Sequence, residues 1–191
     1  MFKTNKIIIL SGASGAGKTT LVKHLLSCPK LNLEFSVSAC TRKKRSLEKN
    51  SKHYKFFSHE EFKNKISSGD FLEWEEVYRG CFYGTLKYAT IDLLNSGKNI
   101  LFDVDVNGAQ TIKKYFKDQA ISIFIQAPSM DVSRERLTNR RTESEEELQV
   151  RLEKIIHEIE IGKKMDFQLF NDELNKSKEE IYNLVLRFLK Q

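Results

Sequence analysis

The chain has 191 residues, of which 40% are hydrophobic and 30% charged, and its formal net charge at pH 7 is +6. This composition is sufficient for one globular domain with a hydrophobic core, and it excludes a low-complexity chain. The basic residues are spread along the chain rather than gathered in a tail, so a solvated surface accounts for most of them. Binding of nucleic acid or of small anionic ligands would also account for a positive charge.

The cysteines and the first residues of the sequence bear on the cellular compartment in which the protein is expected. The three cysteines are odd in number and form no CxxC pair. A disulfide framework or a zinc site is therefore not expected, and a reducing compartment fits. The apolar run in "MFKTNKIIILSG" is too short for a signal peptide or a membrane span. We expect a soluble cytoplasmic protein with no membrane partner.

The first half of the chain alternates between strands and helices. Residues 6–10 form a short apolar run, which predicts a fully buried parallel strand, and helical spacing of apolar residues begins at Thr19. Ser58 and Glu61 form a capping box, which predicts the start of a helix. In chain order, the predicted elements are a strand at 6–10, a helix from 19 to about 28, a strand at 34–39, a basic and turn-rich segment at 40–57, a helix from 58 to 69, a strand at 71–78, a loop at 81–86 and a helix at 87–96.

The second half continues the alternation. Ser177 and Glu180 resemble a second capping box, which predicts the start of the last helix. An alternation of strands and helices is typical of an α/β protein with a parallel sheet, and the mixed segment from about 36 to 86 interrupts it as a candidate insertion. The predicted buried strands are 99–105, 120–128 and 167–172, and the predicted helices are 108–117, 131–140, 145–164 and 178–189.

A glycine-rich segment joins the first strand to the first helix and fits the phosphate-loop pattern G-x-x-x-x-G-K-S/T. Glycines permit positive φ and leave room for successive backbone N–H groups to surround phosphates, and the following helix adds its positive N-terminal end. Lys18 would reach the β- and γ-phosphates of a nucleotide, and the Thr19 hydroxyl would face Mg²⁺. The predicted phosphate-binding residues are Gly12, Ala13, Ser14, Gly15, Ala16, Gly17, Lys18 and Thr19.

Asp103 ends the apolar run "ILFD". In proteins with a phosphate loop, an acid at this place supports Mg²⁺, usually through water. Many strands end in aspartate, so the prediction depends on the loop. Together they predict a Mg²⁺ site formed by Thr19 and Asp103.

Six further motifs, "FSVSACTRKKR", "KHYKFF", "FLEW", "FYGT", "LFDVDVNG" and "FIQAPS", occur in the order and spacing of guanylate kinases. The chain resembles that family from Lys6 to about Asp172. The resemblance implies a single α/β domain: a parallel sheet with a phosphate loop and flanking helices, an inserted mixed α/β subdomain that binds GMP, and a helical lid. The implied boundaries are about 1–35, 87–130 and 156–191 for the core, 36–86 for the insertion and 131–155 for the lid.

The basic loop supplies groups that suit an acceptor phosphate. Arg42 and Arg45 offer planar guanidinium forks to phosphate oxygens, and Tyr54 and Tyr83 can each add a hydroxyl donor. The resemblance implies that these four residues bind the phosphate of GMP. Taken without the aromatic and acidic residues downstream, "TRKKR" favours a basic surface loop or an RNA contact.

Glu73 in "FLEW" is the candidate for base recognition. Guanine presents two adjacent donors that one carboxylate can accept together, and adenine does not. The resemblance assigns this role to Glu73 and implies further guanine contacts from Ser38, Thr85 and Asp105. Taken alone, Glu73 fits an ordinary solvent-facing acid, and Phe71 and Trp74 are expected in the core.

Arginines in the segment 131–155 could stabilise the charge of phosphoryl transfer. The resemblance implies catalytic roles for Arg136, Arg140 and Arg151 together with Lys18, and it places Asn171 near the adenine of ATP. The simpler interpretations are a charged helix face for the arginines and a strand-ending turn for Asn171.

Three positions depart from the family pattern. Lys44 replaces a proline of the basic loop, and Ser46 and Arg141 replace glycines. These changes affect expected loop and lid flexibility rather than the reaction class. We therefore expect an enzyme that uses ATP and Mg²⁺ to convert GMP or dGMP to the diphosphate, with no nucleic acid partner. The alternatives are an inactive guanylate-kinase-like binding module and a kinase for another phosphorylated acceptor.

Overall fold

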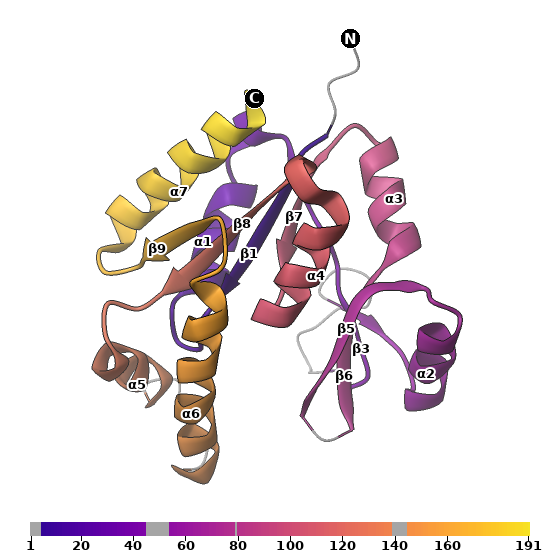
Figure 1. Ribbon diagram of the computed structural model, residues 1–191, viewed down its shortest axis with the longest axis horizontal. Helices are drawn as coiled ribbons and strands as arrows, with labels where there is room; N and C mark the ends of the chain where they lie inside the picture. Colours follow the sequence, from indigo (N-terminus) through magenta and orange to yellow (C-terminus); the bar gives the residue numbers. More distant parts are fainter. Residues whose placement is uncertain (1–4, 45–53, 79, 139–144) are drawn as a thin grey trace.

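The computed structural model describes residues 5–44, 54–78, 80–138 and 145–191 (Figure 1). Its larger sheet has five parallel strands in the order β2-β7-β1-β8-β9. The central strand carries a continuous apolar run, and Ile7, Ile8, Ile9 and Leu10 are all fully buried, as expected for a strand covered on both faces. The strands are β1 (Ile7–Gly12), β2 (Leu33–Phe35), β7 (Asn99–Asp103), β8 (Ala120–Gln126) and β9 (Phe167–Phe170).

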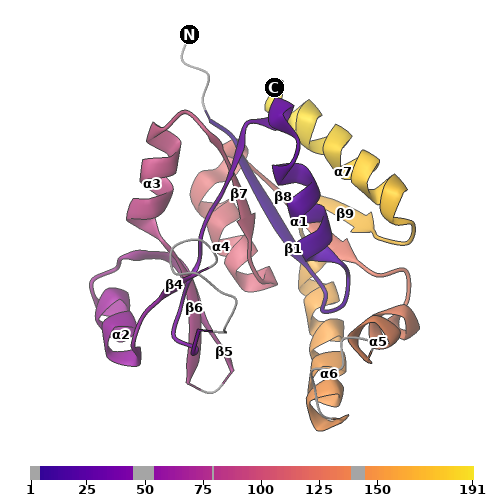
Figure 2. The same ribbon diagram turned by 180° about the vertical axis from the view of Figure 1, so that it is seen from behind.

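Helices cover both faces of this sheet (Figures 1 and 2). Helices α1 (Lys18–Leu26) and α7 (Leu174–Leu189) pack together on one face. On the other face lie α4 (Val106–Phe116) and the C-terminal part of α6 (Glu145–Gly162), both of which contact β1. The predicted α/β class with a helix-flanked parallel sheet is therefore confirmed.

A second, four-stranded sheet has the order β4-β3-β6-β5 and is joined to the larger sheet through α3 (Lys87–Asn95). It has a small core of its own, made of Ala39, Phe62, Phe71, Phe82 and Leu86. The rings of Phe62 and Phe71 stack with their centroids 4.4 Å apart. Its elements are β3 (Ala39–Cys40), β4 (Lys55–Phe56), β5 (Phe71–Tyr78), β6 (Cys81–Leu86) and α2 (His59–Ser67).

The second sheet and the pair α5 (Met130–Thr138) and α6 project from the same end of the larger sheet (Figure 1). This is the end at which β1, β7 and β8 finish, because parallel strands place their carboxyl ends together. Two short 3₁₀ helices, η1 (Pro29–Leu31) and η2 (Lys117–Gln119), complete the fold. None of the helices in the described ranges is both long enough and apolar enough to cross a membrane.

Two predictions in the first half of the chain were wrong. The run 34–39 is not one strand, because Phe35 in β2 pairs with Leu101 of the larger sheet and Ala39 in β3 pairs with Gly84 of the smaller one. The segment 81–86, expected to be a loop, is strand β6 and pairs with both β5 and β3. The apolar pattern marks extended backbone in both places, but it does not identify the sheet that the backbone joins.

Two predictions near the C-terminus were also wrong. Helix α7 begins at Leu174, and Ser177 lies inside it with 2% of its surface exposed, so Ser177 is not a cap. Strand β9 is at the edge of the sheet, and only Leu169 is buried in it. By contrast, the capping box of α2 is confirmed: the Ser58 hydroxyl accepts from the Glu61 N–H at 3.1 Å, and the Ser58 N–H donates to Glu61 Oε2 at 2.7 Å.

Candidate active site

The phosphate loop lies between β1 and α1 and is held by three neighbouring elements. The Ala13 N–H donates to the Ile125 carbonyl of β8 at 3.0 Å. The Ser14 N–H donates to Glu158 Oε2 of α6 at 3.1 Å. The Asn171 amide, just after β9, donates to the Ala16 carbonyl at 2.8 Å. These contacts fix the path of the loop from outside and leave its concave side to a ligand.

The inner face of the loop offers backbone donors. Gly17 has a φ of 84°, which L side chains rarely adopt, and a Cβ there would clash with the Asn171 amide. Helix α1 starts directly after it, so its first N–H groups point toward the same space. Among the described residues, no acceptor is hydrogen-bonded to the N–H groups of Gly15, Gly17, Lys18 and Thr19.

Lys18 extends from the start of α1 to the end of β7. Its Nζ lies 3.1 Å from Asp103 Oδ1 and 3.4 Å from the Val104 carbonyl oxygen. Both side chains of the Lys18–Asp103 pair are 23% exposed. The register of β1 and β7, which places Leu10 opposite Asp103, brings the acid to the mouth of the loop.

Thr19 and Asp103 have the chemistry that Mg²⁺ prefers, since both offer oxygen ligands. No group of three or more His, Cys, Asp or Glu side chains in the described ranges is arranged to hold a metal ion. An ion bound here would therefore share its coordination between one or two protein oxygens, the nucleotide phosphates and water, which is how Mg²⁺ is usually bound beside phosphates.

A pocket of about 390 Å³ lies between the two sheets and opens beside Lys18. It is lined on one side by the middle of β5 and of β6 and by the residues that precede β3 and β4, and on the other side by the end of β7 and the residues that follow it. The structure thus brings together residues far apart in the sequence. The predicted site residues that line it are Ser38, Tyr54, Glu73, Tyr83 and Asp105, with Lys18 and Asp103 from the larger sheet.

Arg42 is held in an aromatic cluster next to this pocket. Its Nε donates to the Tyr83 hydroxyl at 3.0 Å, and its guanidinium lies 4.7 Å from the ring centre of Tyr54 and 5.6 Å from that of Phe56. Burial raises the pKa of Tyr83 to about 12 and raises that of Tyr54. Both phenols therefore keep their protons at neutral pH, and because Tyr83 accepts from Arg42, its own O–H is available to donate to a phosphate.

Glu73 lies in the pocket with its carboxylate fixed by Thr85, whose hydroxyl donates to Glu73 Oε1 at 2.6 Å. Burial raises the pKa of Glu73 to about 7, an effect that the hydrogen bond from Thr85 opposes and the nearby Asp105 reinforces. Thr85 itself is 1% exposed. This burial places Thr85 where it orients Glu73, and its predicted contact with guanine stays a prediction.

Asp105 caps helix α4, where its Oδ1 accepts from the Gly108 N–H at 2.7 Å. Beside it lies Glu75, which sequence analysis missed although it lines the same pocket. The neighbouring Asp105 carboxyl raises the pKa of Glu75 to about 7, and burial adds to the shift. Strand periodicity in the sequence could have identified Glu75, because residues 73 and 75 point to the same face of β5.

The same alternation turns Trp74 outward. Trp74, which was expected in the core, is 47% exposed, whereas Phe71 is buried as expected.

Arg136 and Asn171 form a link between α5 and the phosphate loop. Arg136 Nη2 donates to the Asn171 backbone carbonyl at 3.0 Å, while the Asn171 side chain bonds to the loop at Ala16. Asn171 is 4% exposed. Arg136 Nη1 is buried and has no partner in the described part of the chain, so it can bind an additional acceptor.

Comparisons with known proteins agree with this geometry. The guanylate kinase family model matches residues 4–187. The chain belongs to the guanylate kinase family. It is 44% identical over 184 residues to the guanylate kinase of Porphyromonas gingivalis, covering 96% of this chain and 98% of that protein. It is 42% identical over 186 residues to that of Bacteroides thetaiotaomicron, covering 97% and 91%.

A solved structure shows the same fold. The crystal structure of guanylate kinase from Anaplasma phagocytophilum superposes with a TM-score of 0.78 at 28% identity, covering 99% of this chain and 88% of that one. Three arginines that the resemblance marks as functional in guanylate kinases are not placed here. Arg45 and Arg140 lie outside the described residues, as do Ser46 and Arg141, and Arg151 lies in α6 without a described side chain. Lys44, the last residue described before the gap, is exposed.

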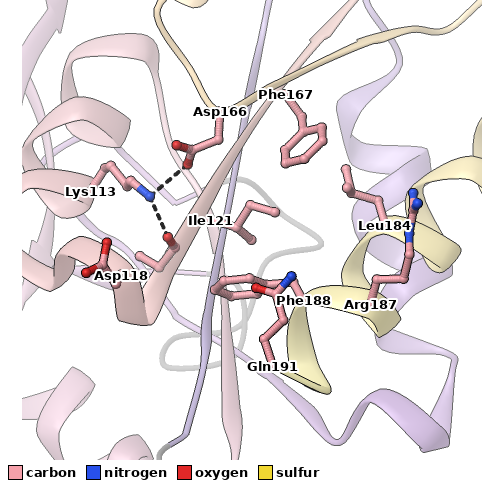
Figure 3. A pocket seen from close by; sticks show the side chains of 10 residues that line it. Lys113, Asp118, Ile121, Asp166, Phe167, Leu184, Arg187, Phe188 and Gln191 are labelled. Carbon is pink, nitrogen blue, oxygen red and sulfur yellow. Dashed lines mark hydrogen bonds and ion pairs between the residues drawn. The ribbon is translucent and has the colours of Figure 1, made fainter.

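A second hollow, of about 400 Å³, lies at the opposite end of the parallel strands from the guanylate kinase motifs (Figure 3). Two of its charged groups are already paired: Lys113 Nζ lies 2.9 Å from Asp166 Oδ2 and 2.7 Å from the Ala120 carbonyl oxygen. None of the predicted site residues lines it. Its similar size therefore does not make it a competing active site.

Proposed function

We propose that this member of the guanylate kinase family transfers the γ-phosphate of ATP to GMP or dGMP, giving ADP and the guanosine diphosphate. The observation that carries the proposal is the pocket between the sheets. One cavity is lined by Glu73 from the second sheet and by Lys18 and Asp103 at the phosphate loop. A purine held by Glu73 would therefore have its phosphate close to the donor.

The donor nucleotide would bind along the phosphate loop. The N–H groups of Gly15 and Gly17, which have no acceptor among the described residues, and the positive end of α1 would contact its phosphates. Lys18 would exchange its contact with Asp103 for the β- and γ-phosphates. Bound Mg²⁺, held near Thr19 and Asp103, supplies charge neutralisation at the phosphate oxygens.

The acceptor would bind through its two ends. Arg42, together with the hydroxyls of Tyr54 and Tyr83, supplies a planar cation and neutral donors for the phosphate. Glu73 would accept the two adjacent N–H donors of guanine, and Ser38 and Asp105 line the same pocket. A carboxylate at this place discriminates against adenine, because adenine presents an acceptor where guanine presents a donor.

The chemical step needs little beyond positioning and charge. Phosphoryl transfer passes through a transition state with charge on the phosphoryl oxygens, and cations aimed at them lower its free energy. Arg136, with Nη1 still unpaired, is placed between the loop and α5 for this purpose. We propose that Arg140 and Arg151 act with it, and that Asn171 holds the loop and the adenine side of the site.

The domain plan follows from the same proposal. Residues 36–86, which contain the second sheet, would form the acceptor subdomain, and 131–155 would form the lid. The remaining segments, about 1–35, 87–130 and 156–191, would form the core that holds the donor.

A coupled assay that measures ADP formation from ATP and Mg²⁺ would test the proposed activity across the nucleoside monophosphates. We expect GMP and dGMP to be phosphorylated with a kcat/KM at least about 100-fold above AMP, CMP and UMP, as expected when a site hydrogen-bonds a feature that the competitor lacks. Equal use of all monophosphates would refute the guanine assignment. Tight GMP binding without turnover would instead indicate a binding module.

A further inference from the structure

Glu158 is a buried acid that the proposed reaction does not use. It lies in α6 with 9% of its surface exposed, on the same helix face as Ile155, which is fully buried. Gly162, one turn further, packs against the Phe124 ring so closely that a Cβ would clash with it. At a position between these two contacts, packing alone would favour an apolar side chain.

The carboxylate of Glu158 faces the phosphate loop. Its Oε2 accepts the Ser14 N–H at 3.1 Å. Burial raises the pKa of Glu158, while the hydrogen bond from Ser14 and the positive charges of Lys154 and Lys18 oppose the rise. The acid is thus removed from water and oriented toward one backbone donor of the loop, with cations close enough to favour its ionised form.

Burying a carboxylate costs free energy that one hydrogen bond offsets only in part. A leucine at this position would avoid the cost and could fill the same space between α6 and the sheet. The presence of an acid therefore indicates a purpose other than stability, and its only hydrogen bond among the described contacts is the one to Ser14.

Because Glu158 belongs to α6, its hydrogen bond to Ser14 connects the phosphate loop with the pair of helices α5 and α6. The helix runs without interruption from Glu145 to Gly162; its middle turns lie beside α5, and its last turns lie on the sheet (Figure 1). A continuous helix moves largely as a rigid rod. A displacement of its N-terminal end is therefore transmitted to the turn that holds the loop.

We propose that Glu158 is a positioning residue for the phosphoryl donor, which holds the Ser14 N–H and thereby ties the phosphate loop to the lid helix α6. The inference rests on the proposed function, in that the loop binds ATP. Without the carboxylate, the loop between Ala13 and Gly15 loses its contact with α6 and must be reordered when the nucleotide binds. The acceptor pocket, which Glu158 does not line, is unaffected.

The test compares Glu158→Ala, Glu158→Leu and Glu158→Gln with Glu160→Ala as the matched control. Glu160 is an exposed acid on the same helix, and among the described residues its ion pair is with Lys163 at the surface. We expect Glu158→Ala and Glu158→Leu to weaken binding of a non-hydrolysable ATP analogue, measured by calorimetry, by about 10- to 100-fold. Glu158→Gln, whose amide oxygen still accepts from Ser14, should stay within about threefold of the parent protein.

Kinetic readouts separate positioning from packing. The KM for ATP should rise in Glu158→Ala and Glu158→Leu while the KM for GMP stays unchanged, and the melting temperature of Glu158→Leu should not fall. An ATP affinity equal to that of Glu160→Ala, equal changes for both substrates, or failure of Glu158→Gln to restore binding would overturn the inference. Calorimetry measures binding of the ATP analogue without turnover. If the parent protein binds the analogue but does not phosphorylate GMP, the proposed function is refuted. The effect of the Glu158 substitutions on ATP affinity can still be compared in that case.

Discussion

Replacing Glu73 by glutamine changes one charge in the acceptor pocket and little of its shape. The Gln oxygen can still accept from Thr85, but its NH₂ group would face a guanine donor where the carboxylate offered an acceptor. The loss of one good hydrogen bond to a charged group and the exposure of an unpaired donor cost about 1–3 kcal/mol. We therefore expect the KM for GMP to rise by about 5- to 150-fold, with the KM for ATP unchanged.

The same substitution has a calculable effect on stability. Burial raises the pKa of Glu73 to about 7 in the folded protein, against 4.5 as its ordinary value. The folded state therefore holds this proton more tightly, and the resulting stabilisation is complete below pH 4.5 and is lost as the pH rises through 7. Above pH 7 the buried ionised carboxyl costs about 3 kcal/mol, and glutamine, which does not ionise, avoids that cost.

Urea denaturation of both proteins from pH 4 to 8.5, with GMP kinetics on the same samples, measures both effects. Relative to the parent protein, Glu73→Gln should gain about 3 kcal/mol of unfolding free energy between the low and high ends of this range. A stability difference that does not vary with pH would show that Glu73 is not buried as described. An unchanged KM for GMP would show that it does not contact the base.

Three further substitutions test other parts of the molecule. Lys18→Ala should lower kcat by a factor on the order of 10³ or more while the circular dichroism spectrum is preserved, and ordinary turnover in this variant would contradict the role of the loop. Arg42→Lys should raise the KM for GMP by about tenfold in steady-state kinetics, because an ammonium cannot stack on Tyr54 and donate to Tyr83 in the same geometry. An unchanged KM for GMP would exclude Arg42 from phosphate binding. Phe62→Ala should lower the unfolding free energy by about 3–5 kcal/mol in urea titrations, and a loss under 1 kcal/mol would mean that the second core is not closely packed.

The larger sheet could be predicted because three of its strands are continuous apolar runs. Each of these runs is followed directly by one of the sequence motifs, which marks its carboxyl end. Residues 6–10, 99–105 and 120–128 were each identified within a few residues. The second sheet was predicted less well. Strand β5 was identified with its bounds, but β3 and β4 have only two residues each. The pattern around 34–39 therefore did not reveal that the chain passes from one sheet to the other between Phe35 and Ala39, and β6 was not recognised as a strand.

The site shows a similar division. The phosphate loop could be identified from local sequence because all its groups are consecutive. Glu158 could not be identified in this way, since its importance comes from its contact with Ser14, which lies far away in the chain. Strand periodicity places Glu75 on the same face as Glu73, but its proximity to Asp105 could not be read from local sequence. The exposure of Trp74 follows from strand alternation once Glu73 is directed into the pocket, but an aromatic residue in an apolar run favours the core when it is considered alone.

The separation of the hydrophobic cores has a consequence for how the molecule opens. The core around Phe62 is much smaller than the one beneath β1, so less buried apolar area resists its local unfolding. Amide hydrogens of β3 and β6 should then exchange with solvent through partial opening, while those of β1 exchange only when the whole chain unfolds. The second sheet, which we propose selects the base, can thus loosen and re-form many times while the larger sheet stays intact.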